Sequence, residues 1–281
     1  MNSENTKYHI RRLDINVAYA CNIKCKGCIS LSDFDRTGVV SAADVDSWLA
    51  YWSPWLDIDV LTLFGGEPLL NPELDSICKI VRKYYPTSTL RLITNGYLLK
   101  NFDSQSWFSL QPFELQVSVH RLDHEDVINK QIAKIMKPHS GWKTTKNNLN
   151  QHQQILFELP GFKIYKSKFK DFVAPYRLIN QKLLPFDSDP IQAHKICGSP
   201  NTPILYKGKL YKCPPVANII DVTKHNWNNY EACSSTEQLE HFVSAIGKAE
   251  AVCGQCPDNF SQHTYNHFDP ANVYVKQKIT G

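Results

Sequence analysis

Along the first two-thirds of the chain, short apolar runs alternate with amphipathic segments of helical spacing. Apolar runs of the length typical of buried strands lie at residues 13–17, 59–64, 90–94, 115–119 and 162–165. Strands that alternate with helices in this way form a mostly parallel sheet with crossover helices. The pattern therefore predicts an α/β fold. Residues 137–154 are polar and rich in Asn and Gln, so the fifth strand is undefined and the run at 162–165 is expected to be the sixth.

Helices are predicted between these strands. The first begins after Ser41, which can cap it together with Asp44. Its apolar positions recur on one face, at Val45, Trp48, Leu49 and Trp52. Residues 72–84 open with Pro and acidic residues and predict a second helix, and residues 123–136 predict another.

The composition and the periodicity of the sequence change after about residue 184. Residues 185–190 contain Pro and Asp in a linker-like passage, and the chain beyond them has several cysteines and few long periodic segments. We therefore predict a larger domain at residues 1–184 and a small Cys-rich α+β domain at residues 185–281.

Two elements are predicted inside the smaller domain. Residues 204–206 and 210–212 flank a Lys-Gly-Lys turn, which predicts a hairpin. Ser234 and Glu237 have the spacing of a capping box, which predicts a helix that runs through Ile246.

Composition narrows the class of protein. The chain has 281 residues, of which 42% are hydrophobic and 21% charged, and its formal net charge is +4. This length and hydrophobic content suffice for a full-size core. The chain has no signal-peptide core and no apolar run long enough to span a bilayer, so we expect a cytoplasmic protein without membrane partners. Aromatic residues are not interleaved with a basic stripe, so nucleic-acid binding is not expected.

The cysteines fall into groups. An odd number, nine, without a secretion signal favours metal binding or thiol chemistry over disulfides. One set of three is Cys21, Cys25 and Cys28; a set of four is Cys197, Cys213, Cys253 and Cys256; and Cys78 and Cys233 stand apart.

The set of three has the spacing C-x3-C-x2-C and directly follows the first predicted strand. A closed zinc site or a fully ligated [4Fe–4S] cluster needs four protein ligands. Three cysteines with no nearby fourth Cys or His therefore leave one metal position open to a small molecule. A zinc site completed by a distant His is the alternative.

Polar motifs follow the next strands, where the carboxyl ends of parallel strands share the ligand-binding edge of a sheet. Glycine allows backbone carbonyls to approach a small cation closely, and a carboxylate adds charge. The motifs are Gly65-Gly66-Glu67-Pro68, Thr94-Asn95-Gly96, and Ser118 with His120.

The triad, followed in order by these motifs, resembles the radical S-adenosylmethionine (SAM) superfamily. The resemblance implies a partial (β/α)6 barrel, a [4Fe–4S] cluster on the three cysteines and SAM on its open iron. It also implies roles for single residues. Gly65, Gly66, Glu67 and Pro68 would bind the amino group of SAM. Asn95 and Ser118 would bind its ribose and carboxylate, and His120 and Arg121 would lie nearer the substrate.

One residue departs from the pattern of this superfamily. The residue before the third cysteine is commonly aromatic and contacts adenine, whereas Gly27 stands there in this chain. The adenine contact is therefore expected to come from another part of the sequence.

The set of four cysteines could saturate a second [4Fe–4S] cluster, and a zinc ribbon is the alternative. The order of a Cys, a hairpin, a second Cys, a helix and a final C-x2-C resembles the twitch domain, a shortened relative of the SPASM domain. Cys233 is a candidate for a substitute ligand or a hydrogen-atom donor, with a plain buried thiol as the alternative. Cys78 is expected in the core.

The resemblance implies an oxidoreductase-type enzyme that cleaves SAM to a 5′-deoxyadenosyl radical, with the auxiliary cluster accepting an electron in a net oxidation. An external one-electron reductant such as flavodoxin or ferredoxin would be a partner. The first motif begins at residue 21, so no preceding leader-recognition domain is expected, which favours a small polar substrate that is sugar-, cyclitol- or nucleotide-like.

Other functions stay open. Lysines crowd one segment near residues 163–170 and raise the hypothesis of an anionic substrate. The alternatives to a small-molecule enzyme are a maturase of ribosomal peptides and a structural zinc-binding protein.

Overall fold

The computed structural model describes residues 7–101, 104–149, 152–180, 182–259 and 264–276. The strands of this part are β1 (Tyr8–Ala18), β2 (Ile23–Cys25), β3 (Leu56–Gly65), β4 (Thr89–Thr94), β5 (Phe113–Val119), β6 (Lys143–Leu149), β7 (His152–Leu159), β8 (Phe162–Phe169), β9 (Asp171–Val173), β10 (Arg177–Ile179), β11 (Lys182–Leu184), β12 (Ile204–Tyr206), β13 (Lys209–Tyr211), β14 (Thr264–Asn266) and β15 (Val273–Val275). The α-helices are α1 (Ala42–Trp52), α2 (Leu74–Tyr84), α3 (Ser104–Phe108), α4 (Glu125–Met136), α5 (Pro190–Lys195), α6 (Pro214–Thr223) and α7 (Leu239–Ala245).

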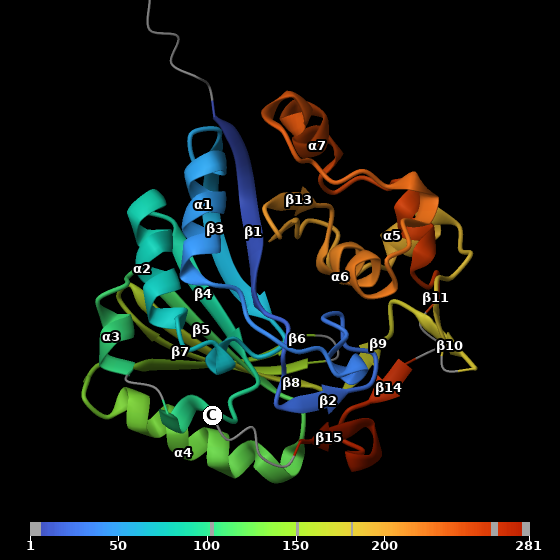
Figure 1. Cartoon of the computed structure of the whole chain (residues 1–281). Coiled ribbons are helices and arrows are strands. Elements are labelled where there is room, and N and C mark those ends of the chain that lie inside the picture. Colours follow the sequence, from blue (N-terminus) through green and yellow to red (C-terminus); the bar gives the residue numbers. More distant parts are fainter. Residues whose placement is uncertain (1–6, 102–103, 150–151, 181, 260–263, 277–281) are drawn as a thin grey trace, which may run out of the picture.

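The largest sheet of the described residues has nine strands in the order β13-β12-β1-β3-β4-β5-β8-β7-β6. From β12 through β8 the neighbouring strands are parallel. Figure 1 shows the sheet curving through the molecule, with α1, α2 and α4 along its outer side and the C-terminal helices α5, α6 and α7 on the other side. The predicted α/β fold with a mostly parallel sheet is confirmed, and it is consistent with a partial barrel.

Helix α1 forms where the sequence predicts it. The hydroxyl of Ser41 accepts a hydrogen bond from the backbone N–H of Asp44 and caps the helix. The buried face packs on the sheet, and the indole of Trp52 donates to the carbonyl of Gly208 at 3.0 Å. The first helix therefore also contacts the turn of the C-terminal hairpin.

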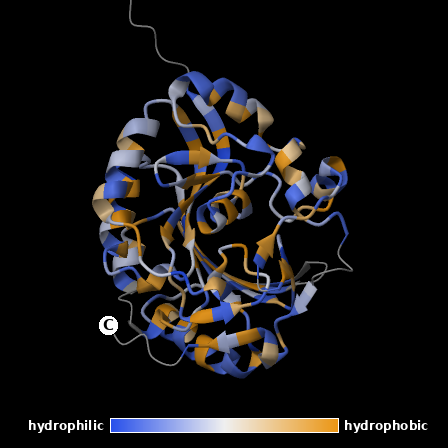
Figure 2. Cartoon of the chain, turned by 45° about the vertical axis from the view of Figure 1, so that its right-hand side comes forward, coloured by the Kyte–Doolittle hydropathy of each residue, from blue (hydrophilic) through white to orange (hydrophobic). Residues whose placement is uncertain are grey.

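The two faces of β1 have opposite character because successive side chains of a strand point to opposite sides. Leu13, Ile15 and Val17 are fully buried in the main core, under the outer helices. Asp14 and Asn16 point to the concave side and are also buried. Figure 2 shows the hydrophobic residues gathered along the central strands and the hydrophilic ones on many outer turns.

The polar segment without a predicted strand forms an antiparallel hairpin, β6 and β7, that extends the sheet beyond β8. Strand β8 pairs directly with β5, with Phe113 opposite Phe162. The strand predicted as the sixth is therefore the fifth of the parallel series in the first two-thirds of the chain. A polar hairpin is suited to this position because one of its strands is a solvent-facing edge.

The segment after residue 184 returns repeatedly to strands of the first part. The predicted hairpin is confirmed as β12 and β13, and β12 joins the main sheet in parallel with β1. Strand β14 pairs with β9, and β15 pairs with β2. The division at residues 184 and 185 stays a prediction. No helix of the described residues is long and apolar enough to cross a membrane.

The helix predicted after Ser234 begins one residue later. Ser235 is the N-cap, and its capping box is completed by Gln238 in place of Glu237. Gln238 also accepts from the backbone N–H of Ser234, so the preceding residue belongs to the turn. After this 3₁₀ turn, α7 ends at Ala245.

Candidate metal and cofactor site

The three N-terminal cysteines share one cavity at the carboxyl end of the parallel strands. Cys21 follows β1, Cys25 ends β2, and the backbone N–H of Cys28 donates to the carbonyl of Cys25 at 3.2 Å. All three line a cavity of about 300 Å³. The tight turn between β2 and the 3₁₀ turn that follows therefore brings thiols from a short stretch of sequence to one wall.

Burial determines the protonation of these thiols. It raises the pKa of Cys21 to about 12 and also raises the pKa of Cys25 and Cys28. The neighbouring thiols add to the shift of Cys25 through like-charge repulsion. Without a cation the thiols are neutral, and a positively charged metal group would favour the thiolate forms that act as ligands.

Segments from the C-terminal part of the chain hold this loop. Strand β15 pairs with β2, placing Val273 opposite Cys25. The backbone N–H of Lys26 donates to the carbonyl of Asn272 at 3.0 Å, and that of Gly27 donates to the hydroxyl of Tyr176 at 3.2 Å. The loop is thus fixed by hydrogen bonds from distant parts of the sequence.

The glycine loop after β3 packs directly against the end of β1. A Cβ on Gly65 would lie 2.3 Å from the carbonyl oxygen of Ala18, and one on Gly66 would lie 2.2 Å from that of Ala20. The backbone N–H of Gly66 donates to the carbonyl of Ala18 at 2.8 Å. Close approach of these backbones accounts for both glycines, and both also line the cavity.

The carboxylate of Glu67 is fully buried and joins the ends of two strands. Its Oε1 accepts from the hydroxyl of Thr94 at 2.7 Å and from the backbone N–H of Leu69 at 3.0 Å. Its Oε2 accepts from the backbone N–H of Asn95 at 2.8 Å. Glu67 therefore holds the loops that follow β3 and β4, and Pro68 begins the 3₁₀ turn Pro68–Leu70 beside it.

Asn95 and Ser118 lie on the cavity wall, as the sequence predicts. The amide of Asn95 donates to the side-chain oxygen of Asn22 at 2.7 Å, and its nitrogen lies 3.7 Å from the sulfur of Cys21. Ser118 is buried and pairs across the sheet with Ser167. Their contacts with a cofactor stay a prediction.

The residues predicted to act near the substrate lie at different places in the structure. His120 lines the cavity. Arg121 instead points to Asp123, at 2.9 Å from Nε, and to the carbonyl of Val273, at 3.0 Å from Nη1. Cys233 is buried on the wall of a different cavity, of about 570 Å³, in the C-terminal part of the chain.

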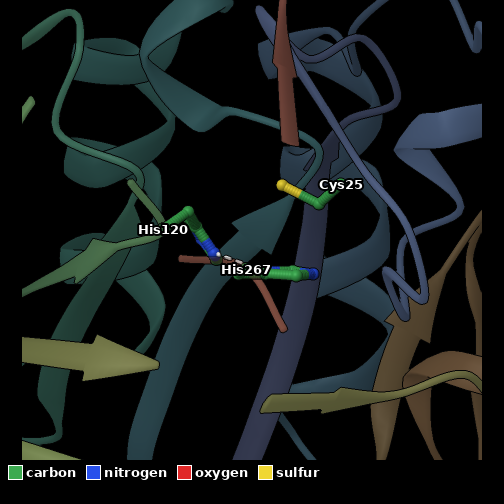
Figure 3. Close-up of side chains that lie close together, drawn as sticks. All are labelled: Cys25, His120 and His267. Atoms are coloured by element: carbon green, nitrogen blue, oxygen red, sulfur yellow. Dashed lines mark hydrogen bonds between the residues drawn. The ribbon is translucent and has the colours of Figure 1, made fainter. Parts of the chain in front are cut away.

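A residue that the sequence did not indicate, His267, lies beside His120 and Cys25. The ligand atoms of these three side chains lie within 4.8 Å of one another, and Figure 3 shows the two imidazoles meeting below the cysteine. The Nδ1 atoms of the histidines are 3.3 Å apart, and Nε2 of His267 is 2.8 Å from the carbonyl oxygen of Lys26. Burial lowers the pKa of His120 to about 3 and that of His267 to about 4, so both rings are neutral.

The four C-terminal cysteines also lie near one another. Cys213 directly precedes α6, Cys253 lies within the 3₁₀ turn Ala251–Gln255, and Cys256 directly follows that turn. Burial raises the pKa of Cys256, and the nearby thiols of Cys213, Cys197 and Cys253 raise it further. Cys78 is fully buried in the core, as predicted.

Two sequence neighbours of the C-terminal cysteines line the same cavity as the triad. Gly198 and Pro214 line it together with the N-terminal triad. These residues directly follow Cys197 and Cys213 in the sequence. A group bound by the C-terminal set would therefore lie close to this cavity.

The lysines near residues 163–170 do not face this cavity in the described structure. Nζ of Lys166 and Nζ of Lys168 each lie 2.7 Å from an oxygen of Glu125, and Nζ of Lys163 lies 3.4 Å from Glu158. Lys163, Lys166 and Lys168 are thus paired with carboxylates, and the hypothesis of an anionic substrate stays a prediction.

Comparisons with known proteins agree with this geometry. A family model described as the radical SAM superfamily matches residues 15–154. GTP 3′,8-cyclase of Campylobacter jejuni subsp. doylei is 29% identical over 118 residues, which cover 41% of this chain and 37% of that protein. GTP 3′,8-cyclase of Tolumonas auensis is 31% identical over 119 residues, which cover 42% of this chain and 34% of that protein. The chain thus spans little more than a third of the length of these curated relatives.

Some solved structures match nearly the whole chain. One of them is the crystal structure of BtrN in complex with AdoMet and 2-DOIA, with a TM-score of 0.51 at 13% identity over 92% of this chain and 100% of that one. At this identity the match concerns the fold alone.

A parallel α/β sheet with three cysteines in a cavity at its carboxyl edge is an arrangement suited to binding a metal cluster and a small cofactor. Residues 15–154 are a domain of the radical SAM superfamily. Membership implies a [4Fe–4S] cluster and SAM. The residues fit both groups, because the triad, the glycine loop, Asn95 and Ser118 all border one cavity.

Proposed function

We propose that the protein is a radical SAM enzyme in which Cys21, Cys25 and Cys28 hold a [4Fe–4S] cluster with one open iron. The observation that carries the proposal is the single cavity shared by these cysteines, the glycine loop and the polar strand ends. When bound, the cluster and SAM would supply a 5′-deoxyadenosyl radical for hydrogen-atom abstraction. The chain's own residues would orient the substrate and exclude water.

The spacing of the cysteines supports a cluster over single zinc ions. Thiolates of a tetrahedral zinc site lie about 3.8 Å apart, because each Zn–S bond is about 2.3 Å. In the described part of the chain, only Cys25, His120 and His267 bring three ligand atoms within 4.8 Å of one another. Neither cysteine set has three thiols within this limit, which is consistent with ligands of a larger cluster.

We extend the proposal to an auxiliary [4Fe–4S] cluster on Cys197, Cys213, Cys253 and Cys256, in a domain of the twitch type at residues 185–281. Four cysteines leave no iron open, so this cluster would exchange electrons and would not bind SAM. Gly198 and Pro214, which follow two of these cysteines, line the cavity, and this proximity supports transfer of an electron from the substrate in a net oxidation. An external one-electron reductant such as flavodoxin or ferredoxin would supply the first cluster.

The lining of the cavity supports a small polar substrate. Nε of Arg12 donates to Oδ1 of Asp14 at 2.7 Å, and both residues line the cavity with Gln116. A wall that offers both donors and acceptors suits a molecule rich in hydroxyl or amino groups, such as a sugar-, cyclitol- or nucleotide-like compound. His120 also lines this cavity and is our candidate for contact with the bound molecules.

The test is to reconstitute the protein with iron and sulfide without oxygen, and to measure iron per chain and the electron paramagnetic resonance spectrum with and without SAM. About eight irons are expected in the unchanged protein. Replacing the three N-terminal cysteines with Ala should leave about four irons and remove the SAM-sensitive signal. Replacing the four C-terminal cysteines should also leave about four, with that signal retained.

Cys78→Ala is the matched control, since Cys78 is buried in the core away from both sets, and it should keep the full iron content. If the variant without the N-terminal triad holds no iron at all, the protein is a radical SAM enzyme without an auxiliary cluster. Stoichiometric zinc and no iron would contradict the proposal.

A further inference from the structure

A corner of aromatic rings lies on the cavity wall next to the cysteines. Phe172 and His120 both line the cavity, with ring centroids 5.3 Å apart. His267 lies behind them, fully buried, and stacks on Phe172 with centroids 3.8 Å apart and an interplanar angle of 11°. Phe172 therefore has one face covered by His267 and is held rigidly at the edge of the cavity.

The hydrogen bonds of His267 fix the tautomers of both histidines. A carbonyl oxygen only accepts, so Nε2 of His267 must carry the proton that bonds to Lys26. In a neutral imidazole the other nitrogen, Nδ1, is then an acceptor. The contact of 3.3 Å between the Nδ1 atoms requires one proton, which His120 must supply. Nε2 of His120 is therefore left as an acceptor.

The same corner explains Gly27. A Cβ at this position would lie 3.0 Å from the ring of Tyr265 and 3.4 Å from the carbonyl oxygen of Phe172. The ring of Tyr265 in β14 and the backbone of β9 thus occupy the space beside residue 27, and no large side chain fits there. The aromatic surface near the third cysteine comes from distant segments of the chain.

We infer that Phe172 and His120 form the pocket for the adenine of SAM, with His267 as the residue that positions them. This inference rests on the proposed function, because it takes SAM to bind at the triad. Adenine is a flat ring that stacks on an aromatic face, and its 6-amino group is a hydrogen-bond donor that matches the acceptor at Nε2 of His120. A purine with a 6-oxo group presents an acceptor there and leaves Nε2 unpaired.

The test compares SAM with its 6-oxo analogue, S-inosylmethionine, by calorimetric titration of the anaerobically reconstituted protein without reductant. The unchanged protein should bind SAM about tenfold more tightly than the analogue, the worth of one hydrogen bond. His267→Phe keeps a stacked ring but removes the acceptor for His120, so the ratio should fall to about two or less. Phe172→Leu should weaken both ligands about tenfold and keep their ratio.

His124→Phe is the matched control. His124 is also stacked on an aromatic ring, that of Tyr97, with centroids 3.6 Å apart, but it does not line the cavity. Both dissociation constants should stay unchanged in this variant. Iron per chain is measured in every variant, so a loss of folding is recognised as such.

If His267→Phe loses iron, His120→Leu replaces it, because it removes the same acceptor and should abolish the same preference. Equal affinity of the unchanged protein for the two purines would overturn the inference. A preference that survives in the His267 or His120 variant would also overturn it. Absence of SAM binding by protein that holds its full iron would contradict the proposed function itself.

Discussion

Glu67 is a buried carboxylate whose two oxygens both accept backbone hydrogen bonds, from Leu69 at Oε1 and from Asn95 at Oε2. An amide can accept at only one end, so Glu67→Gln would turn its nitrogen toward a backbone N–H. At a pH above 7, where Glu67 is ionised, we expect the free energy of unfolding to fall by about 1–3 kcal/mol. Urea denaturation measures this.

Glu73→Gln is the matched control. The Oε2 atom of Glu73 accepts from the backbone N–H of Ala42 at 3.0 Å in an exposed position, and the oxygen of an amide can still do so. Its effect should stay within about 0.5 kcal/mol. Equal losses in the two variants would contradict the special role of the buried carboxylate.

Glu67 also makes stability depend on pH. Burial raises its pKa from 4.5 to about 7, although hydrogen bonds from Asn95, Thr94 and Leu69 oppose the shift. Between these values the folded protein keeps a proton that the unfolded chain has lost. The contribution of protonated Glu67 to the free energy of unfolding is therefore complete below about pH 4.5 and is lost as the pH rises toward 7.

The size of this loss is on the order of 3 kcal/mol. Urea denaturation at a series of pH values should show the free energy of unfolding falling across this window in the unchanged protein. Glu67→Gln has no proton to lose and should show a flatter profile. The same slope in both proteins would assign the effect to other groups.

Gly66 tests why the loop after β3 needs glycine. A Cβ there would lie 2.2 Å from the carbonyl oxygen of Ala20 and 2.7 Å from its carbonyl carbon, and backbone atoms cannot move aside as a flexible side chain can. Gly66→Ala should reduce the free energy of unfolding by at least about 3 kcal/mol. Gly198→Ala, where nothing lies within 4 Å, should change it by less than about 0.5 kcal/mol. Comparable losses would show that the contact with Ala20 is not the cause.

Site residues that lie at a characteristic spacing in the sequence could be predicted. Site residues that act together with a partner far away in the sequence could not. Cys21, Cys25 and Cys28 lie within eight residues, so their convergence follows from local geometry. His267 reaches the same place from another end of the chain, and one histidine in a polar segment gives no signal of its partner. Its pairing with His120 became evident only in the structure.

At the scale of elements, periodicity predicted the strands and helices of the parallel sheet, because each has one apolar side that must be buried. The hairpin of β6 and β7 was missed since its residues are polar and it lies at the sheet edge. The capping box was displaced by one residue because Ser234 and Ser235 have the same chemistry, and only the structure shows which of them caps the turn.

Strand β15 has a function that its short length does not suggest. It pairs with β2 beside the cluster loop, and Val273 is fully buried against Cys21, Ile23 and Cys25. Val273→Asp would place a charge among these groups at a cost of more than about 3 kcal/mol. We expect the variant to lose most of the iron of the N-terminal cluster during anaerobic gel filtration.

Tyr274→Asp is the control within the same strand. Tyr274 is 59% exposed and points away from the cluster loop, so the same charge should be tolerated there. Iron per chain should match that of the unchanged protein. Full iron in Val273→Asp, or equal loss in both variants, would show that β15 does not protect the loop.

At the scale of the whole molecule, the C-terminal part completes the site of the N-terminal part. Strand β12 extends the main sheet, β15 holds the cysteine loop, and β14 packs its tyrosine beside Gly27. Local patterns predicted the hairpin of β12 and β13 but not these pairings, because strands of three residues carry no sequence signal for a distant partner. The change of texture after residue 184 therefore says little about how closely the two parts pack.

Arg36 is one of the polar links between the two parts. Its side chain is 8% exposed, and Nη2 lies 3.0 Å from Oδ2 of Asp221, while Nη1 donates to the carbonyl of Ser30 at 3.1 Å. Burial alone would raise the pKa of Asp221, but hydrogen bonds from Lys207, Tyr206 and Lys224 hold it below its usual range. The carboxylate is thus ionised and connects α6 to the loop that follows the cysteines.

We expect Arg36→Gln to lower the free energy of unfolding by about 3 kcal/mol, because it leaves a partly buried carboxylate with fewer partners. Asp221→Asn should have a similar effect, and the double variant should cost less than the sum by about 1–3 kcal/mol, the coupling energy of the pair. Lys224 is another partner of this carboxylate, but its side chain is 76% exposed. Lys224→Gln should therefore change the free energy of unfolding by less than about 0.5 kcal/mol. Urea denaturation of the four variants measures these values. Additive losses would mean that Arg36 and Asp221 stabilise their own segments independently, and that the link between the two parts lies elsewhere.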